Sequence, residues 1–234
     1  MKLDKFLYEA IKPEANKSDP YGEYLFAPQR TDVPVPKEGN TREEELLYYA
    51  LLDMFQGNDQ KSLKKYSQKI LNLLNQNKYT TLLSSGDIKV YRGMVISRER
   101  LSGLIKPYGE EIKYNKYVTM NLPNKLKPSK GKLLQSWSTN VNRAADFSDS
   151  RGGLHGIPPG ETVSIIFAAR TYAEGNNFFG APGKLARVVA SSFASEKETI
   201  SVGPVEYDGF AYFIGSSGGK YASGSLAKAA KKVA

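Results

Sequence analysis

The chain changes character at the stretch Leu133-Leu134-Gln135-Ser136-Trp137-Ser138-Thr139-Asn140. Residues 133–138 are typical of a β-strand, and the hydroxyl and amide groups that follow are suited to capping a short helix at 142–149. Apolar residues recur at helical spacing before this stretch. Helices first and strands later favour an α+β fold over alternating βαβ units. The remaining strands of this half are predicted at 161–169, 186–191, 197–202 and 205–214.

Two helices are predicted upstream, and both are interpreted as core packing. The first begins at Thr41, because Thr41 and Glu44 have the spacing of a capping box, and the second covers 61–76. Next comes a short strand at 88–91 that ends at Arg92-Gly93. Ser97 is predicted to cap a short helix after it. Residues 106–132 contain seven Lys and are predicted to be mostly irregular, with one short strand at 117–120.

Three other segments are assigned from composition. Residues 13–40 hold five Pro, which predicts an irregular N-terminal arm over 1–40. Residues 216–234 start with Ser and Gly and carry four Lys and no acid, which predicts a flexible basic tail. The Gly-rich and Asn-rich segments at 151–160 and 174–184 are predicted to be loops. One domain is expected over 41–215, with helices at 41–80 and a β-rich core at 86–215.

Composition limits the available chemistry. The 234 residues include no Cys and one His, which excludes cysteine nucleophiles and thiolate zinc sites and disfavours a Ser/His/Asp triad. Catalysis would therefore use carboxylates, hydroxyls, Arg, Lys, Tyr or a bound small molecule. The formal net charge is +9, which suits acidic partners. No apolar run is long enough to cross a membrane, and the acidic Asp4 and Glu9 interrupt any secretory signal.

Three short motifs follow one another in the sequence. Tyr91-Arg92-Gly93 offers a guanidinium that can fork onto a phosphate, beside a residue that lets a flat ligand approach the backbone. Ser138-Thr139-Asn140 offers a hydroxyl that can orient a carboxylate. Glu196-Lys197-Glu198 enters a predicted strand, where alternation places its two carboxylates on one face. The motifs are 46 and 60 residues apart, measured from Arg92 to Ser138 and from Ser138 to Glu198.

In this order and spacing the motifs resemble the arginine–serine–glutamate class of mono-ADP-ribosyltransferases, which includes actin-modifying binary toxins and bacteriophage enzymes. The aromatic Trp137 before the serine motif also fits, whereas Asn140 stands where the class usually has a hydroxyl residue. The resemblance covers residues 88–202. It implies two packed antiparallel sheets around an NAD cleft, with a helical part before them.

The resemblance also implies roles for individual residues. Arg92, with Tyr91 and Thr139 beside the ligand, would hold the NAD phosphates, and the Gly93 backbone would bind the nicotinamide amide. Ser138 would hold Glu198 in place, and Glu198 would stabilise the oxocarbenium-like transition state as nicotinamide leaves.

The acceptor side is also assigned by the resemblance. Glu196 would position an arginine of the target protein. Phe178 and Phe179, in a loop predicted to be exposed, are candidates for target recognition. Phe147 and Phe179 are alternatives for stacking on the nicotinamide or on the target.

The expected protein is a monomeric transferase that acts in the cytoplasm of a host cell, made there or delivered with a virion. Its acceptor would be a host protein, with RNA polymerase and translation proteins as candidates and NAD-capped RNA as a further donor. The basic charge keeps two alternatives open: a nucleic-acid-binding protein, and an internal virion protein without activity.

Overall fold

The computed structural model describes residues 38–55, 61–76, 78–83, 87–126, 134–149, 161–171, 176–180, 198–215 and 221–233. The chain divides into two compact units, one formed by residues 1–81 and 182–196 and the other by residues 82–181 and 197–234. Several predicted features lie outside the described residues: the arm before residue 38, the loop at 151–160, the strand at 186–191, and Glu196.

The first unit contains α3 (Arg42–Phe55), the 3-10 helix η1 (Lys61–Tyr66) and α4 (Ser67–Leu74). The predicted capping box is confirmed: the Glu44 N–H donates to Thr41 Oγ1 at 3.3 Å, and the Thr41 N–H donates to Glu44 Oε2 at 3.0 Å. The Glu44 carboxylate is buried and also accepts from the Tyr79 hydroxyl at 2.9 Å. One side chain thus caps α3 and holds the turn after α4. Among the residues whose burial is described, both helices bury apolar side chains, as predicted, including Leu47 and Ile70; Tyr66 is half-buried.

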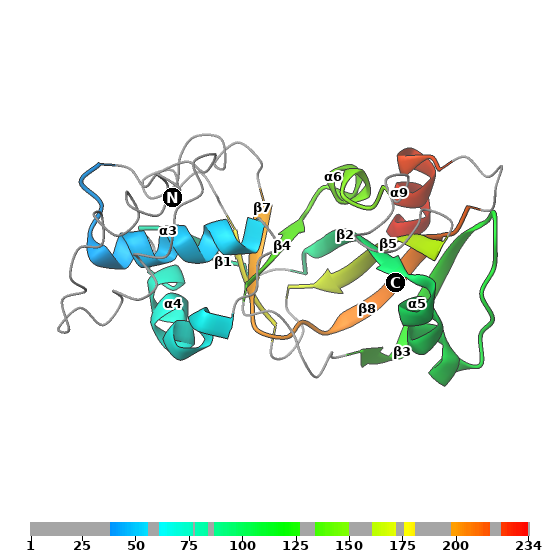
Figure 1. The fold of residues 1–234 in the computed structure, drawn as a ribbon, viewed down its shortest axis with the longest axis horizontal. Coiled ribbons are helices and arrows are strands. Elements are labelled where there is room, and N and C mark those ends of the chain that lie inside the picture. Colours follow the sequence, from blue (N-terminus) through cyan, green and yellow to red (C-terminus); the bar gives the residue numbers. More distant parts are fainter. Residues whose placement is uncertain are drawn as a thin grey trace, which may run out of the picture. The chain divides into compact units, whose positions relative to one another are not determined.

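The second unit is built on a sheet whose strands run in the order β1-β6-β7-β4-β2-β5-β8-β3 (Figure 1). Every pairing with a defined register is antiparallel. The predicted α+β class is confirmed. The strands are β1 (Thr81–Leu82), β2 (Lys89–Ser97), β3 (Tyr117–Leu126), β4 (Leu134–Ser138), β5 (Thr162–Arg170), β6 (Asn177–Gly180), β7 (Glu198–Val202) and β8 (Tyr207–Phe213).

Helices cover both faces of this sheet. The helices α6 (Val141–Asp146) and α9 (Ser223–Lys231) lie on one face, and α5 (Arg98–Ile105), followed by the 3-10 helix η2 (Lys106–Tyr108), lies on the other (Figure 1). β5 is consequently buried on both sides: Ile165 and Phe167 face the α5 side, and Ile166 and Ala168 face the α6 and α9 side. A strand covered on both faces needs a continuous apolar run, which residues 165–169 supply.

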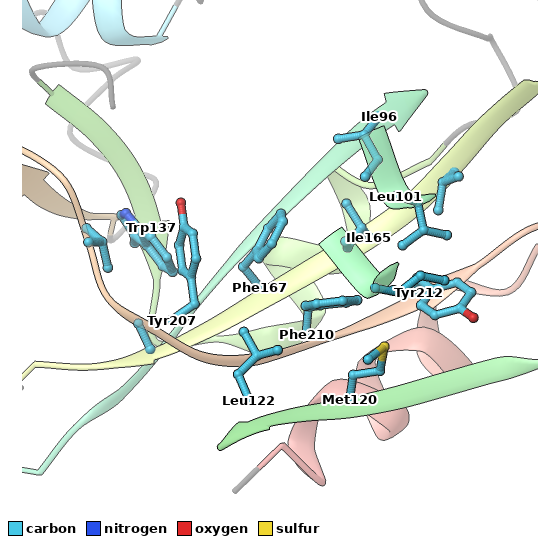
Figure 2. Close-up of a cluster of buried hydrophobic side chains, with 14 of the residues drawn as sticks. Ile96, Leu101, Met120, Leu122, Trp137, Ile165, Phe167, Tyr207, Phe210 and Tyr212 are labelled. Atoms are coloured by element: carbon cyan, nitrogen blue, oxygen red, sulfur yellow. The ribbon is translucent and has the colours of Figure 1, made fainter. Parts of the chain in front are cut away.

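The core on the α5 side is rich in aromatic rings (Figure 2). Tyr207 lies between Phe167 and Trp137, with ring centroids 4.7 Å and 5.8 Å away. The Trp137 ring also meets Phe178 edge to face at 5.4 Å, and its N–H donates to Ser201 Oγ at 3.0 Å. These contacts connect β4, β6 and β7 to β5 and β8, so Trp137 is a core residue that packs the sheet together.

Two strands are longer than predicted. β2 does not end at Arg92-Gly93 but continues to Ser97, because residues 92–97 keep their pairing with β5 as far as Thr162. β3 extends to Leu126, so residues 117–126 are not irregular; they pair with β8 across a register shift between Asn121 and Leu126. In both cases the pairing partner is distant in the sequence. Ser97 caps α5 as predicted, accepting from the Arg100 N–H at 3.2 Å.

The prediction of a flexible C-terminal tail is wrong for residues 221–233. Residues 223–231 form α9, which buries Leu226, Ala227, Ala229 and Ala230 against the sheet. The small Ala side chains let the helix lie close to Ile166, Ala168 and Ala211. Thr119 Oγ1 donates to the Ala229 carbonyl at 2.9 Å, and the Ala222 N–H donates to the Tyr117 hydroxyl at 2.8 Å. An Ala/Lys helix of this length is marginal alone, and tertiary packing stabilises it.

Leu226→Ala should therefore destabilise the protein although it lies only eight residues before the last residue of the sequence. Leu226 is fully buried, so its truncation should lower the free energy of unfolding by about 2–4 kcal/mol. Lys228→Ala, on the exposed side of the same helix, should change it by less than about 0.5 kcal/mol. Urea unfolding of both variants measures the difference. Equal stabilities would mean that α9 is not part of the core in solution.

Candidate functional site

One described residue from each of the three predicted motifs lies where β2, β4 and β7 pair. β4 and β2 share one registered pair, Tyr91 with Ser138. On the other side of β4, Ser138 is also the partner of Glu198 in β7. Tyr91, Ser138 and Glu198 therefore occupy one row across three neighbouring strands, with opposite Cα atoms about 4.5–5.5 Å apart in such pairs. We call these three residues the cross-strand row.

The pairing between β2 and β4 is limited to this row. Because the two strands are antiparallel, β4 runs back past Arg92 and Gly93 through Trp137 and Ser136, but no further residue pair is in register there. In an antiparallel strand alternate residues direct their N–H and C=O groups to opposite edges. Within the described residues, Arg92 and Gly93 are thus in register with β5 on one edge and with no residue of β4 on the other. A sheet edge without a registered partner can bind a ligand through the main chain.

Arg92 is half-buried and reaches from β2 to β4. Its Nη1 donates to the Ser136 carbonyl at 3.0 Å, which fixes one side of the guanidinium. The positive charges of Arg92 and Arg100 both act to lower the pKa of the Tyr207 hydroxyl, although burial outweighs them and raises that pKa. The charges of Arg92 and Arg100 thus act on the same phenol, and such a positive field favours an anion such as a phosphate.

Gly93 is required by packing. A Cβ atom built on it would lie 1.6 Å from the Ala144 carbonyl oxygen and 3.2 Å from the Ser148 nitrogen. The middle and end of α6 thus rest directly on the β2 backbone at this residue, and only glycine allows that approach. The resemblance assigns the Gly93 N–H and C=O to the nicotinamide amide. The packing requirement concerns the direction in which a side chain would point, whereas the proposed role concerns the main-chain polar groups.

Ser138 is nearly buried, and its Oγ accepts from the Asn140 N–H at 3.0 Å. Asn140 in turn caps α6, since its Oδ1 accepts from the Asn142 N–H at 3.0 Å. A hydroxyl that accepts one bond still has its proton to donate. Ser138 therefore closes the turn into α6 and can also donate to a carboxylate on the neighbouring strand. Thr139 is exposed at the end of β4.

The aromatic residues near the site differ from expectation. Phe178 and Phe179 lie in β6, and less than 2% of each side chain is exposed. The predicted exposed loop is wrong at these residues, and such buried rings do not provide a recognition surface. Phe147, directly after α6, is 60% exposed. It neighbours Ser148, whose nitrogen lies at Gly93, so of the two stacking candidates only Phe147 is accessible.

Two residues near the site were missed by the sequence analysis. Arg100 is in the first turn of α5, a position that the Ser97 cap already indicated. Tyr221 contacts the end of α6 from the C-terminal segment, at 2.7 Å from the Ala145 carbonyl. Tyr221 was missed because its segment was interpreted as a flexible tail, and no local pattern in the sequence places residue 221 beside residue 145.

Neither a metal cluster nor a membrane-spanning helix is found in the part of the chain that the structure describes. No group of three or more His, Cys, Asp or Glu side chains there could hold a metal ion. No described helix is long and apolar enough to cross a bilayer.

Comparison with known proteins identifies no relative of this chain. No family model matches the chain, and neither the curated proteins nor the solved structures include a significant match. The residues and their arrangement therefore carry the functional argument alone.

Proposed function

We propose that this protein is an NAD-dependent mono-ADP-ribosyltransferase that modifies arginine side chains of a host protein during phage infection or bacterial attack. The observation that carries the proposal is the cross-strand row. Tyr91, Ser138 and Glu198 come from three separate sequence motifs, and the sheet register aligns them side by side. Such an alignment suits a site that needs an orienting hydroxyl beside a carboxylate, and Arg92 is the next residue of β2 after Tyr91.

Arg92 is proposed to bind the diphosphate of NAD. A planar guanidinium suits forked phosphate contacts, and the nearby charge of Arg100 strengthens the local positive field. The Gly93 main chain, on the edge of β2 that has no registered partner in β4, would bind the nicotinamide amide. The exposed ring of Phe147 would stack on the nicotinamide. These groups would hold NAD with its glycosidic bond facing the cross-strand row.

The carboxylates are proposed to act on the reacting ribose. The bond between ribose C1′ and the nicotinamide nitrogen breaks, and its electron pair stays on the nicotinamide, which leaves neutral. Glu198, oriented by Ser138, would stabilise the positive charge that develops on the ribose. A guanidinium nitrogen of the target then bonds to C1′ and loses a proton, which Glu196 would accept. Because the leaving group is already cationic, no general acid, His or metal is needed.

Transfer of labelled ADP-ribose from NAD to proteins of a bacterial lysate tests the proposal. We expect protein label together with release of nicotinamide, and Arg92→Lys should raise the KM for NAD by about tenfold, because the forked contact is lost. Arg42→Lys is the matched control: Arg42 is exposed and pairs with Glu45 on α3, and its replacement should leave KM unchanged. Folded protein that neither binds NAD nor releases nicotinamide would contradict the proposal.

A further inference from the structure

We infer that Tyr221, in the C-terminal segment, is a positioning residue for the NAD site: its hydroxyl holds the end of α6, which carries Phe147 and rests on β2 at Gly93. This inference rests on the proposed function, because it assigns a consequence for NAD binding. It concerns a segment that the sequence analysis interpreted as a flexible tail, and it makes that segment part of the site.

The contact is a closed group of three oxygen atoms. The Tyr221 hydroxyl donates to the Ala145 carbonyl at 2.7 Å and lies 2.9 Å from Ser148 Oγ. Ser148 Oγ is itself 2.8 Å from the same carbonyl, and Ser148 is fully buried. The two hydroxyl protons can make two of these three contacts at any one time. Tyr221 thus fixes both the last turn of α6 and the residue after Phe147.

The same end of α6 rests on β2 at the candidate site. The Ala144 carbonyl and the Ser148 nitrogen are the atoms that a Cβ on Gly93 would meet. The turn is therefore held from two directions, by Tyr221 on one side and by the β2 backbone on the other. Phe147 lies between Asp146 and Ser148 in this turn and remains exposed. A six-residue helix has few internal hydrogen bonds, so outside contacts decide where its end lies.

Tyr221 is in turn held by the sheet and by α9. Its ring packs at 6.3 Å from Phe213, which stacks on Tyr117 at 4.6 Å. The next residue, Ala222, donates its N–H to the Tyr117 hydroxyl. Burial raises the pKa of Tyr221, so its hydroxyl keeps the proton that it donates at neutral pH. Direct contacts thus connect Phe213 through Tyr221 to Ala145 and Ser148, the residue that follows Phe147.

A double-mutant cycle on the full-length chain tests the inference, with the kinetics of nicotinamide release as the readout. Tyr221→Phe removes one hydrogen bond and should raise the KM for NAD about 3–10-fold with kcat changed less than about twofold. Phe147→Ala should raise the same KM. If Tyr221 acts through Phe147, the double variant should be no worse than Phe147→Ala. Thr119→Val, which removes the hydroxyl bond to Ala229 elsewhere on α9, should leave KM unchanged.

Each outcome separates the inference from the proposed function. An unchanged KM in Tyr221→Phe overturns the positioning role, and so do additive effects of Tyr221→Phe and Phe147→Ala, which would mean that Tyr221 affects the fold generally. Circular dichroism and melting temperature should match the wild type, because Ser148 Oγ still donates to the Ala145 carbonyl. A wild-type chain that binds no NAD overturns the proposed function, and the positioning role with it.

Discussion

Replacing Glu198 by Gln should lower the rate of ADP-ribose transfer on the order of 10³-fold while leaving the fold intact. Glu198 is the residue of the cross-strand row that would stabilise positive charge on the ribose, and an amide carries no charge to do so. Loss of one such electrostatic contact costs about 4 kcal/mol of transition-state stabilisation. The Glu198 backbone pairs with Ser138, and Gln preserves that pairing and the size of the side chain. Labelled NAD transfer measures the rate.

The matched control is Glu110→Gln. Glu110 is an exposed carboxylate that pairs with Lys113 at 3.4 Å, away from the cross-strand row, so its loss should leave the rate unchanged. NAD affinity should change little in Glu198→Gln, because the proposed contact strengthens in the transition state. A Glu198→Gln enzyme with more than a tenth of wild-type activity would remove Glu198 from the catalytic role. Glu196→Gln is informative beside it: the proposed roles predict lost transfer to arginine with continued release of nicotinamide.

The parts of the fold predicted from sequence are those that local chemistry decides. The capping box of Thr41 and Glu44, the Ser97 cap and the buried run of β5 all depend on residues close together in the chain, and the structure confirms them. In each case one short segment contains the whole signal. The order of helices before strands was enough to give the α+β class.

The elements that were missed depend on distant partners. β6 consists of four residues within an Asn-rich and Gly-rich segment, and pairing with β7 makes it a strand. α9 has only Ala, Leu and Lys to indicate a helix, and its burial against Ala168 and Ala211 comes from the rest of the fold. Neither pairing nor burial by residues so far away leaves a local pattern in the sequence.

The candidate site was predicted from the sequence only in part. Its residue types and order were visible in the sequence, and they indicated a chemistry. Their alignment was not visible, because a shift of one residue between β4 and β7 would place Ser138 opposite a different partner. The register supplies that alignment. The sequence also could not show that Phe147 is exposed and Phe179 is buried, because both are aromatic residues near a predicted turn.

Gly93→Ala should be among the most damaging small substitutions in the chain. The added methyl group would lie 1.6 Å from the Ala144 carbonyl oxygen, a backbone atom that can move only if α6 moves. Overpacking against backbone should lower the free energy of unfolding by about 3 kcal/mol. If the variant folds, α6 must lift from β2, and the turn that carries Phe147 should move with it. We therefore expect NAD binding to weaken at least tenfold, measured by calorimetry beside urea unfolding.

Gly103→Ala gives the opposite expectation for the same chemical change. Gly103 is in α5, and nothing lies within 4 Å of a Cβ built there. Alanine should therefore stabilise that helix by roughly 0.5–1 kcal/mol through its higher helix propensity, with NAD affinity unchanged. The contrast between the two variants isolates the contact with α6 from any general effect of replacing glycine. If Gly93→Ala were as stable as Gly103→Ala and bound NAD normally, α6 would not rest on β2 as described, and the site built on that contact would be wrong.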